Sequence, residues 1–142
     1  MKLTCGKCGT KNRVAAERSN DGPVCGRCKA PLLSSGPLEL DHDDFADLTG
    51  SLDLPVVVDF WAPWCGPCRA FAPAYKSVAG ELAGRAVFAK VNTENEEDLA
   101  RRLDIRSIPT LAVFRGGREI ARMSGALPAA QFRDWVESRI AA

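Results

Sequence analysis

The chain has 142 residues, of which 46% are hydrophobic, with 19 basic and 18 acidic residues and a formal net charge of +1. This length and apolar content fit one globular domain with a proper hydrophobic core and leave room for a small appendage. The near balance of charges provides neither a basic field that would attract nucleic acid nor an acidic tail that would bind a basic partner.

The N-terminal residues MKLTCGKCGTKN contain no apolar segment of the kind found in secretory signal peptides. No uninterrupted apolar run is long enough to cross a bilayer, so we expect no membrane association and predict a cytoplasmic location. All six cysteines occur in C-x-x-C pairs. In a reducing compartment this spacing is more typical of metal ligands or redox thiols than of structural disulfides.

The first part of the chain, residues 1–36, is polar and contains four of the six cysteines. Its apolar residues are too few for a core, so we expect it to need a covalent or metal crosslink. The residues SSGP at 34–37 combine Ser, Gly and Pro, which indicates a boundary. We therefore divide the chain into a four-cysteine segment, 1–36, and a larger domain, 37–142.

Cys5 and Cys8 in CGKC, and Cys25 and Cys28 in CGRC, are separated by sixteen residues, a spacing that matches a four-cysteine zinc site. A glycine follows the first cysteine of each pair and would let the backbone turn so that both sulfurs face one ion. Four thiolates leave no open coordination position, which favours one structural zinc per chain. The alternatives are two redox pairs or two disulfides. We expect no organic cofactor.

The zinc segment is also locally basic, and zinc ribbons of this form often contact nucleic acid. It contains no aromatic residues that could stack on bases, so a solvated surface is favoured over a nucleic-acid interface.

In the larger domain, the run PVVVDFW at 55–61 is almost continuously apolar and β-branched, which predicts a strand buried on both faces of a sheet. Further strands are predicted at 38–40, 86–92 and on both sides of Gly116-Gly117, and helices at 41–50, 65–82, 95–104 and 128–140. The order βαβαβαββα predicts an α/β fold with a mixed central sheet and helices on both faces. In it, βαβ units make parallel strands and the hairpin adds an antiparallel edge pair.

Cys65 and Cys68 differ from the other pairs because they follow the buried strand and begin a predicted helix. The helix dipole and the free N–H groups there favour a thiolate, so Cys65 is the expected nucleophile and Cys68, one turn further, the resolving thiol. Gly66 permits close approach of the sulfurs, and Pro67 fits the first helical turn, where no N–H is needed.

Trp61 and Trp64 flank the pair and offer an apolar surface to a protein substrate, although Trp61 could equally belong to the core. Asp59 is the only charge within the apolar strand, so its pKa should be raised towards the range of a general base. The alternative is a structural ion pair with Lys90 of the neighbouring strand.

The segment VDFWAPWCGPCRAFAP, together with AKVN, SIPTL and a Gly-Ala after the hairpin, resembles the thioredoxin family across residues 38–142. The four-cysteine extension makes the whole chain similar to the zinc-bearing type-2 thioredoxins of bacteria. The resemblance implies the thioredoxin fold and a protein-disulfide reductase. It also implies that Asp59 moves protons to and from Cys68.

The same resemblance implies a cis peptide bond at Pro109, with the Ile108 backbone opposite the cysteines to pair with a substrate strand, and Gly125 lining the groove. The implied partners are disulfide-containing proteins and a thioredoxin reductase as electron donor, and we expect a monomer. Two other functions are weighed against this one: a disulfide oxidase or isomerase on the same fold, and a non-enzymatic zinc-ribbon interaction module.

Overall fold

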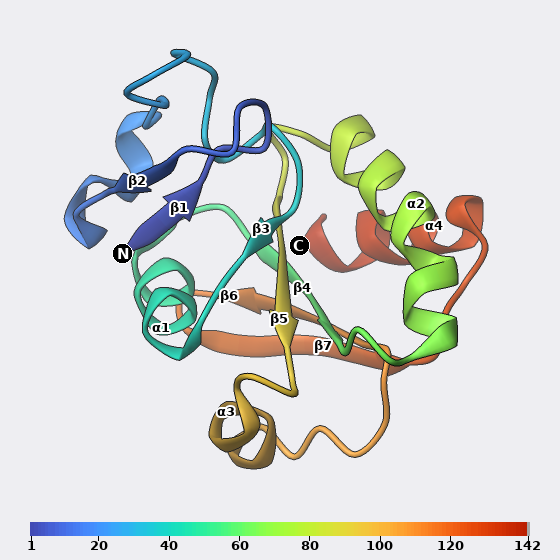
Figure 1. Cartoon of the computed structure of the whole chain (residues 1–142). Coiled ribbons are helices and arrows are strands. Elements are labelled where there is room, and N and C mark those ends of the chain that lie inside the picture. The colour runs from blue at the N-terminus through green and yellow to red at the C-terminus, as the bar shows by residue number, and fades with distance from the viewer. Residues whose placement is uncertain (142) are drawn as a thin grey trace.

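The apolar strands of the larger domain pair into one mixed five-stranded sheet (Figure 1). The computed structural model describes residues 1–141. All but the last residue of the central strand is buried, as the run of valines predicts. In spatial order the strands are β3 (Leu38–Glu39), β5 (Val87–Asn92), β4 (Val56–Trp61), β6 (Thr110–Arg115) and β7 (Arg118–Ser124).

Helices cover both faces of this sheet, as Figure 1 shows and the order of elements predicts. On one face, Phe45 of α1 packs with alternate residues of β4 such as Val58. On the other, Phe71 and Phe132 from α2 and α4 pack with Val57. The four α-helices are α1 (His42–Ser51), α2 (Gly66–Glu81), α3 (Glu97–Arg102) and α4 (Ala129–Ile140).

The helix starts follow local capping chemistry. Asp41 precedes α1, and its carboxylate accepts a hydrogen bond of 2.8 Å from the Asp44 N–H. The helix predicted at 95–104 is shorter in the structure because Asp104 adopts a left-handed conformation, with φ of 57°, just beyond its end.

The direction of β6 departs from the expected succession of parallel βαβ units. β4 is parallel to β5, but β6 is antiparallel to β4. The six residues of α3 span about 9 Å at 1.5 Å per residue, less than half the length of a six-residue strand, so this helix alone does not carry the chain back along the sheet. β6 lies on the other side of β4 from β5, starts at the end of the sheet where β5 finishes, and therefore runs back antiparallel to β4.

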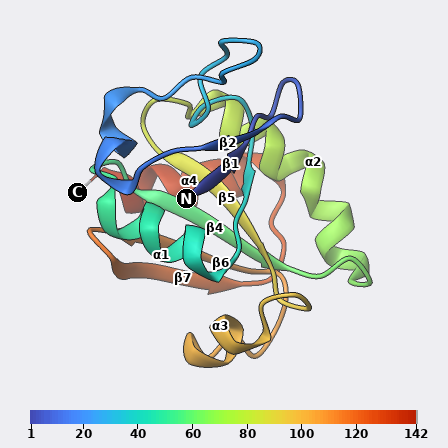
Figure 2. The same ribbon diagram turned by 60° about the vertical axis from the view of Figure 1, so that its left-hand side comes forward.

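The N-terminal segment is a small unit of two antiparallel strands, β1 (Lys2–Thr4) and β2 (Lys11–Arg13), followed by a short 3-10 helix, η1 (Ala16–Asp21). Figures 1 and 2 both place it beside α1 and β3, away from the first turn of α2. Two of its large apolar side chains, Leu3 and Leu32, are fully buried in the cluster that also contains Leu38 and Phe45, whereas Val24 is exposed.

Hydrogen bonds also join the N-terminal segment to the larger domain. The Lys2 N–H donates to the Asp44 carboxylate at 2.7 Å, and the Asn20 side chain bridges the Ser51 carbonyl and the Asp53 N–H. The segment is thus docked on the larger domain through part of its core. A boundary at residue 36 stays a prediction.

Candidate active site and metal centre

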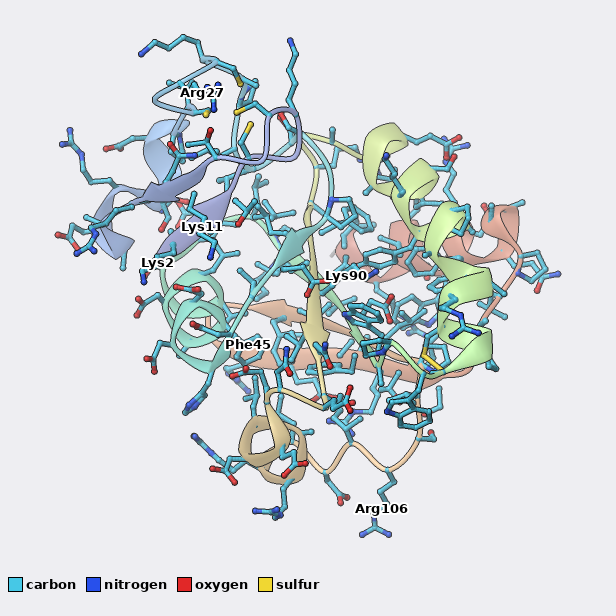
Figure 3. The ribbon with its side chains drawn as sticks, viewed as in Figure 1. Lys2, Lys11, Arg27, Phe45, Lys90 and Arg106 are labelled. Atoms are coloured by element: carbon cyan, nitrogen blue, oxygen red, sulfur yellow. A yellow bond between two sulfur atoms is a disulfide. The ribbon has the colours of Figure 1, made fainter. Side chains whose placement is uncertain are left out.

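Cys65 and Cys68 lie at the start of α2 and are joined by a disulfide, with their Cα atoms 5.2 Å apart (Figure 3). Cys65 is the N-cap residue, and the Cys68 N–H donates to its sulfur at 3.2 Å. Gly66 and Pro67 form the beginning of the helix, where the missing N–H of proline leaves no helical hydrogen bond unmade. In the reduced protein the positive end of a 16-residue helix would favour a thiolate at Cys65.

The loop before β6 lies directly opposite this pair. The carbonyl oxygen of Ile108 is 3.9 Å from the Cys65 sulfur, and the Ile108–Pro109 peptide bond is cis, as the resemblance implies. The Gly125 N–H donates to the Pro109 carbonyl at 2.8 Å. Gly125 has φ of 99°, a conformation that residues with a side chain rarely adopt. The strand end that carries Gly125 therefore helps to hold the loop against the cysteines.

Asp59 is buried on the face of the sheet that α2 covers, with only 1% of its surface exposed. Within residues 1–141, neither carboxylate oxygen has a hydrogen-bond partner. Burial raises the pKa of Asp59 to about 7; the positive charge of Lys90 opposes this rise and the negative charge of Glu39 adds to it.

Lys90 does not form the predicted alternative, a structural ion pair with Asp59. The two residues are in register on β5 and β4, but no ion pair joins them in the described part of the chain. Lys90 instead places its ammonium group 4.2 Å from the centre of the Trp61 ring. Asp59 is therefore a desolvated carboxyl group with a cation nearby, and it is not a partner in a direct ion pair with Lys90.

The two tryptophans occupy different environments. Trp61 is half-buried and packs against the small cluster formed by Ala62, Cys65 and Cys68, so it belongs to the surroundings of the disulfide. Trp64 has 67% of its surface exposed, so it provides an apolar surface of the kind that the sequence predicts. Such an exposed aromatic ring beside the cysteines is available to another protein.

A second group of sulfur atoms lies in the N-terminal segment, close to Arg27 (Figure 3). The sulfurs of Cys5, Cys8, Cys25 and Cys28 all lie within 4.8 Å of one another. Cys5 and Cys28 are 3.6 Å apart, as are Cys8 and Cys25.

The backbone turns that bring each pair of sulfurs together cover residues 6–8 and 26–28, so Gly6 and Gly26 lie in them as the sequence predicts. The residues in the left-handed region are Gly9 and Lys29, which follow the second cysteine of each pair, not the glycines between the cysteines. Gly6 is required for another reason: a Cβ atom there would collide with the carbonyl oxygen of Ser35.

Comparison with known proteins also separates the Cys65–Cys68 pair in the larger domain from the four-cysteine cluster in the N-terminal segment. A family model described as Thioredoxin matches residues 36–138, which is most of the chain. The chain belongs to the thioredoxin family. Because this family's chemistry is exchange at a C-x-x-C disulfide, the chain is a thiol–disulfide oxidoreductase.

Individual thioredoxins are similar over most of the chain. It is 40% identical to Thioredoxin C-3 of Corynebacterium nephridii, over 99% of this chain and 96% of that protein. A mutant thioredoxin from Halobacterium salinarum superposes with a TM-score of 0.67 at 29% identity. The superposition includes 74% of this chain and 91% of the Halobacterium chain. Chloroplastic thioredoxin z gives 0.66 at 32% identity, covering 73% and 94% of the two chains.

A second family model, described as Thioredoxin 2, N-terminal, matches residues 4–30 and includes all four clustered cysteines, which identifies this part as a zinc ribbon. The geometry fits zinc, since four sulfurs about 2.3 Å from one ion would be about 3.8 Å apart. The Lys7 and Arg27 N–H groups donate to the sulfurs of Cys5 and Cys25 at 3.4 Å, an arrangement that stabilises thiolates.

Two residues near the site were not identified by sequence analysis. The Tyr75 hydroxyl is fully buried between the carbonyl oxygens of Val57 and Ala89, at 2.9 and 2.6 Å, so it ties α2 to two strands next to Asp59. Glu39 is in register with Lys90 on the edge strand. The alternation of Leu38, Glu39 and Leu40 places Glu39 on the opposite face from the leucines, but the strand order needed to place it near Asp59 comes only from the fold.

Within residues 1–141, no helix has the length and apolar character needed to span a bilayer.

Proposed function

We propose that the protein reduces protein disulfides through the Cys65–Cys68 dithiol. The Cys65 thiolate attacks one sulfur of the substrate disulfide, so that a mixed disulfide forms and the other substrate sulfur leaves as a thiolate. Cys68 then attacks the Cys65 sulfur, which closes the intramolecular disulfide and releases the second substrate thiolate. Two electrons pass from the dithiol to the substrate.

The observation that carries this proposal is the position of Cys65 at the beginning of α2, within reach of the Ile108 carbonyl. A helix start favours the thiolate that must attack. The pairing of Cys65 with Cys68 across only two residues lets the second thiol reach the mixed disulfide without a large movement of the backbone.

Asp59 is proposed as the general base for the second step. A thiol must lose its proton before it attacks, and a carboxyl group whose pKa is about 7 can accept that proton near neutral pH. Asp59 faces α2, whose first turn carries Cys68. Lys90 supports the ionised form of Asp59 by its positive charge.

The substrate groove is proposed to consist of the exposed Trp64, the backbone of Ile108 and Pro109, and Gly125, with Trp61 beneath the disulfide. An extended substrate segment would pair with the backbone at Ile108 by β-addition. Gly66 and Pro67 support the groove by fixing the geometry between the cysteines.

The wider setting follows from the family, whose members reduce disulfide substrates and are themselves reduced by a thioredoxin reductase. We propose that such a reductase regenerates the Cys65–Cys68 dithiol and that the protein acts as a monomer in the cytoplasm. One zinc ion held by Cys5, Cys8, Cys25 and Cys28 would crosslink the N-terminal segment. Four thiolate ligands leave it no open position for catalysis.

The test is to trap the intermediate. Cys68→Ser should accumulate a mixed disulfide with a protein substrate, detected as a mass increase that a thiol reductant removes, whereas Cys65→Ser should form none. The wild-type protein should reduce the same substrate with multiple turnovers when a reductant regenerates it. Trapping through Cys68 in place of Cys65, or turnover only in the oxidising direction, would contradict the proposal.

A further inference from the structure

Three charged side chains form a row across the sheet. Glu39 of β3 is in register with Lys90 of β5, and Lys90 is in register with Asp59 of β4. Residues in register on adjacent strands point to the same face, and strands are about 4.8 Å apart, so the row extends about 10 Å from the sheet edge to Asp59. Lys90 lies on the middle strand of the row (Figure 3).

Exposure increases from the inner to the outer end of this row. Asp59 is buried without a hydrogen-bond partner, Lys90 is half-buried and Glu39 is exposed on the edge strand. One ammonium group therefore stands between two carboxyl groups, of which only the outer one reaches solvent. Any charge on Glu39 competes with Asp59 for the same cation.

A hollow of about 280 Å³ gives solvent access to the outer end of the row. It lies between α2, the edge of the sheet and the N-terminal segment, and its lining includes Glu39, Lys90, Tyr75, Lys76, Gly6 and Ser35. Asp59 does not line it. Water in this hollow can solvate Glu39 and Lys90 without reaching Asp59. The charges on Glu39 and Lys90 therefore depend on the solvent, and they act electrostatically on the buried carboxyl group of Asp59.

Other charges close to the row are few on the inner side and mixed on the outer side. Tyr75, which also faces Asp59, is neutral because burial raises its pKa well above 10. The Cys65–Cys68 pair is uncharged while it is a disulfide. On the outer side, Lys76 of α2 lines the same hollow as Glu39 and Lys90. Glu39 also borders a second hollow, whose other charged residues are Lys2, Lys11, Asp41, Asp44 and Glu96. Lys90 is therefore the cation that lies directly between Glu39 and Asp59.

We propose that Glu39 is a positioning residue for the reductase reaction, acting through Lys90 and Asp59 to set the pH at which Asp59 takes the proton from Cys68. The inference rests on the proposed role of Asp59 as the base. An ionised Glu39 draws on the charge of Lys90 and repels the Asp59 carboxylate, so Asp59 holds its proton up to a higher pH.

The first experiment follows the Asp59 carboxyl group by carbon-13 NMR during a pH titration of the oxidised protein. Glu39→Gln should lower the pKa of Asp59 by roughly 0.5 to 1, the size expected for a charge about 10 Å away in a partly screened site. Glu94→Gln is the matched control, because Glu94 is also exposed and removing it makes the same charge change outside the row. Coincident Asp59 titrations in the two variants would overturn the inference.

The second experiment measures the Cys68 step in a single turnover, as the rate at which a preformed mixed disulfide resolves at different pH values. Glu39→Gln should shift this pH profile to lower pH by the same amount as it shifts the Asp59 titration. In an Asp59→Asn background the same substitution should have no further effect on the profile, since Glu39 acts through Asp59. An equal shift in that background would overturn the inference.

These outcomes can be separated from a failure of the proposed function. The NMR titration uses no substrate, so it tests the coupling of Glu39 to Asp59 whatever the direction of catalysis. The reductase proposal is tested separately, by whether Cys68→Ser traps substrate through Cys65 and by the direction of turnover.

Discussion

The buried carboxyl group of Asp59 provides a direct test of the electrostatics at the site. Its pKa is about 7 in the folded chain against an ordinary value of 3.8. Between these values the unfolded chain has lost the proton while the folded chain keeps it, so stability falls as the pH rises from about 4 towards 7. Replacing Asp59 by Asn removes the ionisation but keeps the shape, and should therefore stabilise the protein at neutral pH.

The size of the effect follows from the folded and unfolded pKa values of Asp59. A tenfold difference between the two acid dissociation constants corresponds to about 1.4 kcal/mol, so Asp59 should oppose folding by about 4 kcal/mol at pH 7 and about 2 kcal/mol at pH 5. Asp59→Asn should raise the free energy of unfolding by these amounts. For a domain of this size, 4 kcal/mol corresponds to an increase in melting temperature of roughly 10 °C.

The assay is urea denaturation of the oxidised protein at pH 5, 7 and 8, because the disulfide removes the titration of Cys65 and Cys68. Asp53→Asn is the matched control: Asp53 is exposed, so the same substitution should change stability little at any pH. Equal or lower stability of Asp59→Asn at pH 7, or a gain that does not shrink at pH 5, would refute the assignment of Asp59 as a desolvated acid.

Three further variants test other parts of the structure. Leu3→Ala should lower the free energy of unfolding by about 3 kcal/mol, because Leu3 is fully buried in the cluster shared with the larger domain. Denaturation followed by tryptophan fluorescence checks this, and an unchanged midpoint would contradict the shared core. The double variant Cys65→Ser/Cys68→Ser should retain one zinc per chain in metal analysis. Loss of the metal would show that zinc binding depends on Cys65 or Cys68 and would contradict the assignment to the N-terminal cysteines. Tyr75→Phe should cost about 1 kcal/mol in the same denaturation assay through its lost hydrogen bond, and no loss would show that the hydroxyl is dispensable.

The sequence predicted the elements well where one physical cause dominates. The apolar run 55–61 could be stable only inside a sheet, and β4 occupies its centre. The helix start at Cys65 was also predictable, because Gly66 and Pro67 can begin a helix but fit poorly in a strand. These features depend on neighbours in the sequence, so no knowledge of the tertiary structure was needed.

Other features could not be predicted because they depend on contacts between distant segments. β6 is antiparallel to β4, and the helix before it ends beside the left-handed Asp104; periodicity shows neither feature. The neighbourhood of Glu39 depends on β3 pairing with β5 instead of with β4, which follows it in sequence. The burial of Leu3 against the larger domain likewise requires the docked arrangement of the two parts.

The three C-x-x-C pairs have the same spacing, and the surrounding fold makes their chemistry different. Two pairs lie on tight turns of the N-terminal segment, and the fold brings their four sulfurs within 4.8 Å of one another. No such partner pair faces Cys65 and Cys68 in the described residues 1–141. They lie at the start of a helix on the larger domain, where they can bond only to each other or to a substrate.

This difference also separates the energetic roles of the pairs. A metal ion bound by four thiolates has no open coordination position for another ligand. The N-terminal pairs therefore favour a permanent metal crosslink. A redox pair must change its bonding in every cycle, which requires a thiolate at the helix start and a nearby group that accepts a proton. Asp59 can be that group only because the sheet buries it without a hydrogen-bond partner among residues 1–141. A metal held by the N-terminal pairs would add stability in one part of the fold, while the burial of Asp59 costs stability in another.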